Sequence, residues 1–350
     1  MLNLLDLTTE DMQQYVTGLG YPKYRAAQVR KWLYEGVPFE EMSDLPTEMR
    51  AKLASECEQP SLEIKAKLES KLDETKKYLF AVGGGNIIES VLMRYKYGWS
   101  ACISSQIGCR MGCRFCASSG IGFVGDLTAG QMLGQIISMN RDNGIRIGHV
   151  VIMGIGEPMD NYDNVVSFLK KATAEDGLGI SARHISLSTC GVVPGIEKLA
   201  NEGLPVTLSV SLHAPSDDIR SSMMPINNKY SIDKLLNACN SYVGVTGRRI
   251  TFEYSLISGV NDSKEHALML ARKLKGMLCH VNLIPVNKIE NGVYTRPDRK
   301  TIDAFAEVLN GAGISATVRR ELGRDIDAAC GQLRRTLIEQ AANNNEGSGK

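Results

Sequence analysis

The feature that most constrains the fold of this chain is a regular alternation of predicted strands and helices after residue 100. Short apolar and β-branched runs are each followed by a longer amphipathic segment. The predicted strands are Ser100–Ser104, His149–Met153, His184–Ser188, Pro205–Val210, Arg249–Leu256 and Cys279–Ile284. The predicted helices span residues 128–141, 162–174, 194–202, 231–243, 263–275 and 300–311. This order is typical of parallel strands inside a shell of helices.

Six strand–helix units are fewer than the eight of a closed TIM barrel. We therefore expect an α/β fold built on an open, partial (β/α)6 barrel, with a doubly wound sheet as the alternative. A seventh strand is predicted at Ile314–Val318, before a loop and a terminal helix.

Composition and periodicity change along the chain and indicate four segments. Residues 1–58 are predicted to form a small helical accessory domain, with Thr8 as the cap of its first helix. Residues 59–98 alternate with period two and predict a strand-rich connector. The barrel is expected over 99–320. A C-terminal loop, a terminal helix and an Asn/Gly/Ser-rich tail are expected over 321–350.

The charge balance excludes a polybasic protein, because 40 Lys and Arg offset 39 Asp and Glu to leave a net charge of +1. No apolar run approaches the roughly 20 residues of a membrane helix. The first ten residues carry two acids and no basic region, unlike a secretory signal. These features predict a cytoplasmic protein with no membrane partner.

Nine cysteines, an odd number, argue against a disulfide framework. Three of them form the pattern Cys109-x3-Cys113-x2-Cys116 directly after the first predicted strand of the barrel. Three thiolates on one short loop match three corners of a cubane iron–sulfur cluster and leave the fourth iron open. The alternative is a zinc site with Cys102 as the fourth ligand, although only one CxxC pair is present.

Small and polar residues follow several of the predicted strands. Examples are Gly154-Ile-Gly156-Glu157-Pro158 after the second strand and Ser211-Leu212-His213 after the fourth. In parallel α/β folds, ligands bind at the carboxyl ends of the strands. This recurrence predicts one large cofactor on that rim.

The CxxxCxxC loop, with Phe115 before its last cysteine, and the Gly-Glu-Pro turn after the next strand resemble the radical SAM superfamily. The resemblance to the RlmN/Cfr family of RNA adenosine methyltransferases extends over nearly the whole chain. It rests on Cys102-Ile-Ser-Ser-Gln-x-Gly-Cys109, Gly156-Glu-Pro-x-x-Asn161, Ser211-Leu-His-Ala-Pro, Met224-Pro-Ile-Asn227 and Asp325-Ile-Asp-Ala-Ala-Cys330-Gly-Gln-Leu.

The resemblance implies a [4Fe-4S] cluster on the three cysteines and S-adenosyl-L-methionine (SAM), two molecules of which are used per turnover. By motif matching, the residues implied in SAM binding are Gly156, Glu157, Ser188, Ser211, Leu212, His213 and Asn287.

The resemblance also implies three catalytic side chains. Cys330 would first accept a methyl group, and a radical formed on that methyl group would then add to the electron-poor C2 of adenine. Glu89 would accept the C2 proton, and Cys102 would release the product by attacking the sulfur of Cys330. Residue type alone favours a solvent-facing strand position for Glu89 and a buried structural position for Cys102, and only the resemblance favours the catalytic roles.

The implied activity is methylation of adenosine C2 in 23S rRNA at the peptidyl transferase centre, with the tRNA anticodon loop as a second substrate. The nearest alternative is a Cfr-type C8 methyltransferase, and Pro158 favours C2 because Cfr-type sequences have Ala there. A radical SAM activase and a non-catalytic zinc RNA-binding module are further alternatives. A reductant such as flavodoxin or ferredoxin and a monomeric state are expected.

RNA binding by a nearly neutral chain requires a local basic patch. Arg110 and Arg114 flank the cluster cysteines. Further candidates in the C-terminal part are Arg296, Arg299, Lys300, Arg319, Arg320 and Arg324. Contacts with several phosphates predict binding that weakens steeply with salt.

Overall fold

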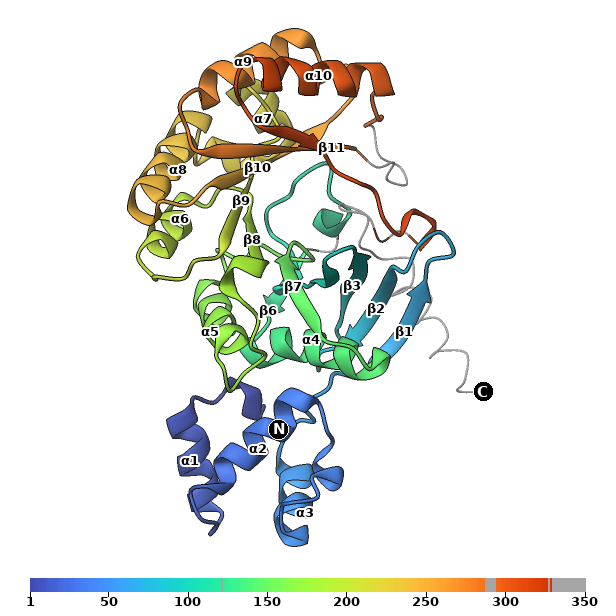
Figure 1. Ribbon diagram of the computed structural model, residues 1–350, viewed down its shortest axis with the longest axis vertical. Helices are drawn as coiled ribbons and strands as arrows, with labels where there is room; N and C mark the ends of the chain where they lie inside the picture. Colours follow the sequence, from blue (N-terminus) through green and yellow to red (C-terminus); the bar gives the residue numbers. More distant parts are fainter. Residues whose placement is uncertain (121, 287–293, 327, 329–350) are drawn as a thin grey trace.

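The computed structural model describes residues 1–120, 122–286, 294–326 and 328 (Figure 1). Its centre is a ten-stranded sheet in the order β1-β2-β3-β4-β7-β8-β9-β10-β11-β12. The strands are β1 Ile64–Glu69, β2 Lys76–Ala81, β3 Ile87–Tyr95, β4 Gly98–Cys102, β7 Ile147–Ile152, β8 Ile185–Thr189, β9 Thr207–Ser211, β10 Ile250–Leu256, β11 Cys279–Pro285 and β12 Ala316–Val318.

The strands from β4 through β7 to β12 are all parallel to one another and curve into an open barrel. They include all six predicted strands and the predicted seventh, so the partial-barrel prediction is confirmed. Helices cover the outside of the sheet, as Figure 1 shows. They are α4 Ala129–Asn143, α5 Tyr162–Thr173, α6 Val193–Ala200, α7 Asp217–Met223, α8 Ile232–Thr246, α9 Lys264–Leu274 and α10 Arg299–Gly311.

The two faces of the barrel sheet differ in polarity. On β9, Leu208 and Val210 belong to the main hydrophobic core, which lies between the sheet and the helices. Ser209 and Ser211 alternate with them and therefore face the interior of the barrel. The core is thus on the outside of the sheet, and the interior is left for polar side chains and ligands.

An antiparallel extension, β1-β2-β3, continues the sheet beyond β4. Its β2–β3 connection contains Gly83–Gly85, a turn that the sequence predicts. Val91 of β3 pairs with Cys102 of β4, which places both side chains on the interior face.

The N-terminal residues form the helices α1 Thr9–Gly18, α2 Arg25–Glu35 and α3 Thr47–Glu56, which form a lobe at one end of the molecule (Figure 1). The predicted capping box is present, since Thr8 and Asp11 each accept a hydrogen bond from the backbone of the other. An ion pair between Arg30 and Asp176, at 3.0 Å, and a 2.6 Å bond from Gly130 N to Asp6 join this lobe to the barrel. None of the helices in the described part of the chain has the length and apolar character of a membrane span.

The cysteine loop is enclosed by a hairpin that the sequence did not predict, with β5 at Gln106–Gly108 and β6 at Phe123–Asp126. The amide of Cys109 donates to Gly122 O at 3.0 Å. A Cβ on Gly108, whose φ is +74°, would lie 1.6 Å from that same oxygen, so the hairpin requires glycine here.

Candidate active site

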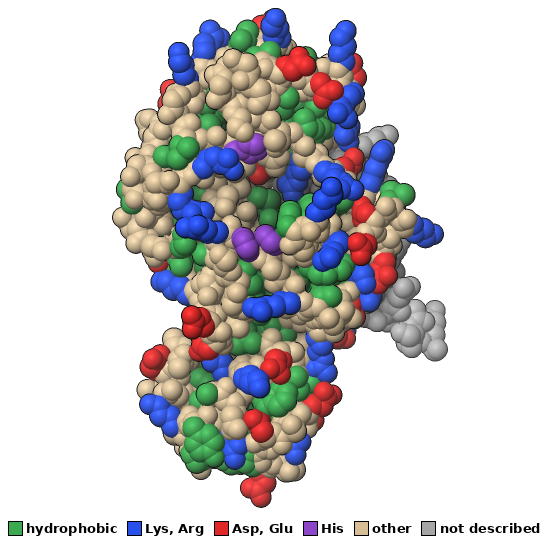
Figure 2. Space-filling model, viewed as in Figure 1, with side chains coloured by type: hydrophobic (Ala, Val, Ile, Leu, Met, Phe, Trp, Pro, Cys, Tyr) green, Lys and Arg blue, Asp and Glu red, His purple; other side chains and the backbone are tan. Residues whose placement is uncertain are grey.

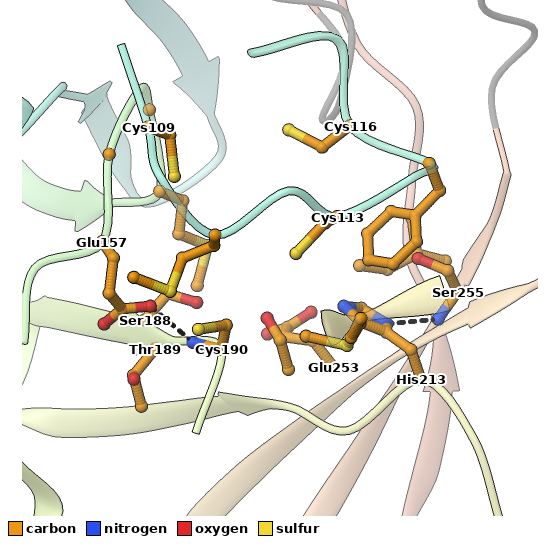
Figure 3. Close-up of a pocket in the computed structure, with 18 of the residues that line it drawn as sticks. Cys109, Cys113, Cys116, Glu157, Ser188, Thr189, Cys190, His213, Glu253 and Ser255 are labelled. Atoms are coloured by element: carbon orange, nitrogen blue, oxygen red, sulfur yellow. Dashed lines mark hydrogen bonds between the residues drawn. The ribbon is translucent and has the colours of Figure 1, made fainter. Parts of the chain in front are cut away.

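A pocket with about 1030 Å³ of empty volume, open solvent included, lies at the carboxyl ends of the parallel strands (Figure 3). Eight of the residues implied in cluster or SAM binding line it: Cys109, Cys113, Cys116, Gly156, Glu157, Ser188, Ser211 and His213. They come from the cysteine loop and from the segments that end β7, β8 and β9.

The cysteine loop is held by backbone hydrogen bonds rather than by regular structure. Cys116 N donates to Cys113 O at 3.1 Å, and Arg114 N donates to Met223 O at 2.9 Å. Arg110 packs over the ring of Phe123 and lies 3.4 Å from Asp160. These contacts direct the three cysteine side chains into one space, as Figure 3 shows.

The donor set fits an iron–sulfur cluster. Burial raises the pKa of Cys109 to about 11, and it raises that of Cys113 further, so the thiols hold protons that a metal would displace. In the part of the chain that the structure describes, no three His, Cys, Asp or Glu side chains converge on one metal ion. A cubane cluster does not need such convergence, because each thiolate binds a different iron.

Glu157 is buried at the wall of this pocket. Its two carboxylate oxygens accept hydrogen bonds from Cys190 N at 2.7 Å and Met159 N at 2.9 Å. Burial raises its pKa, and these backbone bonds act in the opposite direction. The preceding Gly156, at φ +111°, packs so closely on Gln106 that a Cβ would lie 2.6 Å from it. The turn therefore presents a fixed carboxyl group that suits a ligand's amino group.

His213 is the only non-glycine residue with positive φ, 56°, in the described ranges. Its Nδ1 accepts a hydrogen bond from Ser255 N at 2.8 Å, which places the ring proton on Nε2. Phe115 packs edge-on against the ring at 4.7 Å. Burial, with a contribution from Arg220, lowers the pKa of His213 to about 3. The imidazole is consequently a neutral donor facing the pocket.

Several lining residues were not predicted for this pocket, including Cys190 and Glu253, and Arg319 was expected only as an RNA-binding residue. Glu253 is buried on β10, accepts a bond from Asn282 at 2.8 Å and lies 4.0 Å from Arg319. Thr251, Glu253 and Ser255 alternate with apolar residues, and this period-two signal would have identified them as interior-facing.

Glu89 and Cys102 lie outside this lining, on the adjoining interior face of β3 and β4. Cys102 packs in a buried cluster with Val91, Ile155 and Leu322, and Met153 contacts both this cluster and the pocket. Glu89 is two residues before Val91 and shares its face. It is fully buried, not solvent-facing, and its carboxylate lies 3.4 Å from the buried Lys77 ammonium.

The segment that precedes Cys330 also reaches this cluster. Ala328 packs against it, and Gly323 N donates to Asp73 at 3.0 Å. Asp325 accepts bonds from Ser70 Oγ and Lys71 N. Cys330 itself and Asn287 lie outside the described residues.

Leu212 is the one described residue of the implied SAM set whose side chain does not line the pocket. The side chain is fully buried in the main core, and its backbone amide donates to Glu253 O at 3.1 Å. Any contact of Leu212 with a ligand would therefore involve the main chain.

Comparisons with known proteins agree with this geometry. The family model described as "Radical SAM superfamily" matches residues 103–271, and "Ribosomal RNA large subunit methyltransferase N-terminal domain" matches residues 2–58. A "Probable dual-specificity RNA methyltransferase RlmN" of Clostridium botulinum is 53% identical over 97% of this chain and 98% of its own length. The protein of the same description from Clostridium perfringens is 52% identical over 97% of this chain and 98% of its own length.

A solved structure gives the same result. The crystal structure of a radical SAM methyltransferase from Sphaerobacter thermophilus superposes with a TM-score of 0.93 at 44% identity, covering 95% of this chain and 99% of that one.

Proposed function

The chain belongs to the RlmN family of radical SAM enzymes, and we propose that it is a dual-specificity RNA methyltransferase that methylates C2 of adenosine in 23S rRNA and tRNA. The observation that carries the proposal is the pocket at the strand ends. Three thiols, a fixed carboxyl group and a neutral imidazole donor face one space there. This donor set suits a cluster with one open iron and an amino-acid ligand beside it.

When bound, the cluster and SAM would supply the methyl group and the radical that removes a hydrogen atom from it. We assign Cys109, Cys113 and Cys116 to the cluster. Gly156, Glu157, Ser188, Ser211 and His213, with Leu212 and Asn287 by family matching, are assigned to SAM. Glu157 would accept hydrogen bonds from the methionine amino group, and His213 would donate from Nε2.

Three side chains would handle the RNA adduct. Cys330 carries the methyl group, Glu89 accepts the C2 proton, and Cys102 attacks the Cys330 sulfur to release the product. The burial of Glu89 supports its role, because an acceptor excluded from water keeps the proton within the site. The packing of Ala328 on the Cys102 cluster supports that of Cys102, because Cys330 follows Ala328 by two residues.

RNA is proposed to approach the side of the barrel where Arg296, Arg319 and Arg320 line a second pocket. This pocket shares Ile284 and Arg319 with the SAM pocket, so its charge lies next to the reaction site. Lys and Arg side chains also surround the hollowed centre of the face shown in Figure 2. Residues 1–58 are proposed as an accessory RNA-binding domain, followed by a connector (59–98), the barrel (99–320) and the Cys330 segment (321–350).

The remaining parts of the proposal come from the family. Radical chemistry needs single electrons, and we assign their supply to a small carrier such as flavodoxin or ferredoxin. The enzyme is proposed to act as a monomer in the cytoplasm, where both RNA substrates are found.

Mass spectrometry of adenosines from RNA treated with the reconstituted enzyme tests this function. We expect 2-methyladenosine, whereas exclusive formation of the C8 isomer would contradict the assignment and favour the Cfr-type activity. Cys330→Ala should abolish turnover. Cys102→Ala should instead trap a covalent RNA–protein adduct, visible as a band shift in a denaturing gel.

A further inference from the structure

We propose that Arg220 of α7 is a positioning residue of the cofactor pocket: it fixes the ends of β8 and β9 for SAM, and its buried charge favours the reduced cluster. The inference rests on the proposed function, because it assumes that this pocket holds both groups. Arg220 lies behind the pocket and does not line it, so it acts through the residues it holds.

Arg220 is the largest fully buried side chain of the described residues, with an exposed fraction of 0%. Its Nη2 donates to Cys190 O at 2.6 Å and to Ser211 O at 3.1 Å. Its Nε donates to Leu212 O at 3.1 Å, and Nη1 donates to Asn227 Oδ1 at 2.9 Å. One rigid guanidinium therefore joins two strand ends and the loop after α7.

These acceptors belong to the segments that carry the proposed SAM contacts. Cys190 comes two residues after Ser188, and the other two carbonyls are those of Ser211 and Leu212, before His213. Gly191, at φ +104°, permits the approach, because a Cβ there would lie 3.1 Å from Arg220 Nη2. Without the guanidinium, the carbonyls of Cys190 and Ser211 would lose this donor, and that of Leu212 would keep only the bond from Ala214 N at 2.8 Å.

No described carboxylate lies within ion-pair distance of Arg220, and all four acceptors are neutral. The carboxylate of Asp217 is a counter-charge at longer range, linked to Arg220 through the Asn227 side chain. A buried cation with no carboxylate in contact is costly, and thiolates or a cluster in the adjacent pocket would supply a further counter-charge. Arg220 donates to Cys190 O, and Cys190 packs in one buried cluster with Cys113, so the guanidinium lies close to the cysteine loop. Each electron added to a cluster increases its negative charge, and a nearby cation favours that addition.

Helix α7 also contacts the cysteine loop directly. Met223 packs in one buried cluster with Cys113, and its carbonyl accepts the bond from Arg114 N. A change at Arg220 is therefore transmitted to both halves of the pocket, the cluster loop and the SAM-binding strand ends.

Two variants separate the charge from the hydrogen bonds. Arg220→Lys keeps the cation but lacks the planar fork, whereas Arg220→Met removes both. Arg272→Met, at an exposed position of α9, is the matched control. Each reconstituted protein is titrated potentiometrically with electron paramagnetic resonance as the readout, and SAM affinity is measured by equilibrium dialysis.

We expect the reduction equilibrium of Arg220→Met to shift at least tenfold toward the oxidised cluster, which is 59 mV for one electron. Arg220→Lys and the control should keep the wild-type potential. Both Arg220 variants should bind SAM at least tenfold more weakly, since neither reproduces the hydrogen bonds. If Arg220→Met does not fold, Arg220→Lys still tests the SAM prediction. In cluster-free Arg220→Lys, amide hydrogen exchange at Gly191 and His213 should be faster than in the cluster-free wild type.

Unchanged SAM affinity in Arg220→Lys would overturn the positioning role. The charge effect would be overturned if the reduction potential of Arg220→Met equalled that of the wild type. It would also be overturned if Arg220→Lys and Arg220→Met had the same potential. A wild-type protein that incorporates no cluster would contradict the proposed function itself, so the two failures are distinct.

Discussion

At the scale of the residue, the buried imidazole of His213 makes stability depend on pH. Its pKa is about 3 in the folded chain and about 6.5 when unfolded, so below pH 6.5 the unfolded state binds more protons. The contribution of the neutral ring to the stability of the fold is complete above pH 6.5 and is lost as the pH falls toward 3. We predict that the free energy of unfolding decreases by up to about 1.4 kcal/mol per pH unit in this window.

Urea unfolding of the wild type and His213→Asn between pH 4 and 7, roughly the window set by these values, measures this contribution. Asparagine tolerates the positive φ and keeps an acceptor for Ser255 N. The variant should have a shallower pH dependence, and an identical slope in both proteins would contradict the assignment.

Lys77 and Glu89 form a buried ion pair in which each charge compensates the other. Removing one partner of such a pair leaves an uncompensated charge, so Lys77→Met should destabilise the protein by about 3 kcal/mol in urea unfolding. Lys65→Met, on the exposed Lys65–Glu63 pair, is the control and should cost less than about 1 kcal/mol. The double variant Lys77→Met/Glu89→Leu should recover most of the loss; purely additive effects would exclude coupling.

Residue type alone did not indicate these burials. Lys and Arg are normally exposed, so nothing in the sequence identifies Lys77 or Arg220 as interior. The cysteine spacing, in contrast, is local, and the sequence predicts that Cys109, Cys113 and Cys116 lie together without knowledge of the fold. Cys190 lines the same pocket, although its isolated position in the sequence does not indicate this.

At the scale of the element, the junction of β4 and β7 depends on a glycine. A Cβ on Gly154 would lie 2.7 Å from the carbonyl carbon and oxygen of Ile103, so Gly154→Ala must separate the two segments. We predict a loss of about 2 kcal/mol in unfolding free energy and weaker SAM binding. Gly148→Ala, within β7 and with nothing within 4 Å of the added Cβ, is the control. Equal effects of the two changes would refute the close-packing argument.

The barrel strands and their helices were predictable because each has a clear hydrophobic period. Helix α7 was missed because Asp217–Met223 is short, polar and without an apolar stripe. It is held by tertiary contacts, including those of Arg220 and Asp217, which no local pattern reports. The β5–β6 hairpin was also missed because its elements are short, with strands of only three and four residues.

At the scale of the whole molecule, the net charge is only +1, so RNA binding requires a local concentration of positive charge. We propose that the arginines of the second pocket supply it. If Arg320 contacts one phosphate, Arg320→Gln should reduce the slope of log Kd against log salt by about 0.7 for single-stranded RNA. Fluorescence anisotropy with a labelled stem–loop measures the slope. Arg272→Gln should leave it unchanged, and an unchanged slope in Arg320→Gln would place the phosphates elsewhere.

Because the sheet is open, it ends in two strands, β1 and β12, whose outer edges pair with no other strand of the described residues. Such edges invite pairing with strands of other molecules, and proteins oppose this with charge or with short strands. Both devices are present: β1 carries Lys65, Lys67 and Glu69, and β12 has only three residues. The open barrel that leaves room for an RNA substrate thereby also carries its own protection against aggregation.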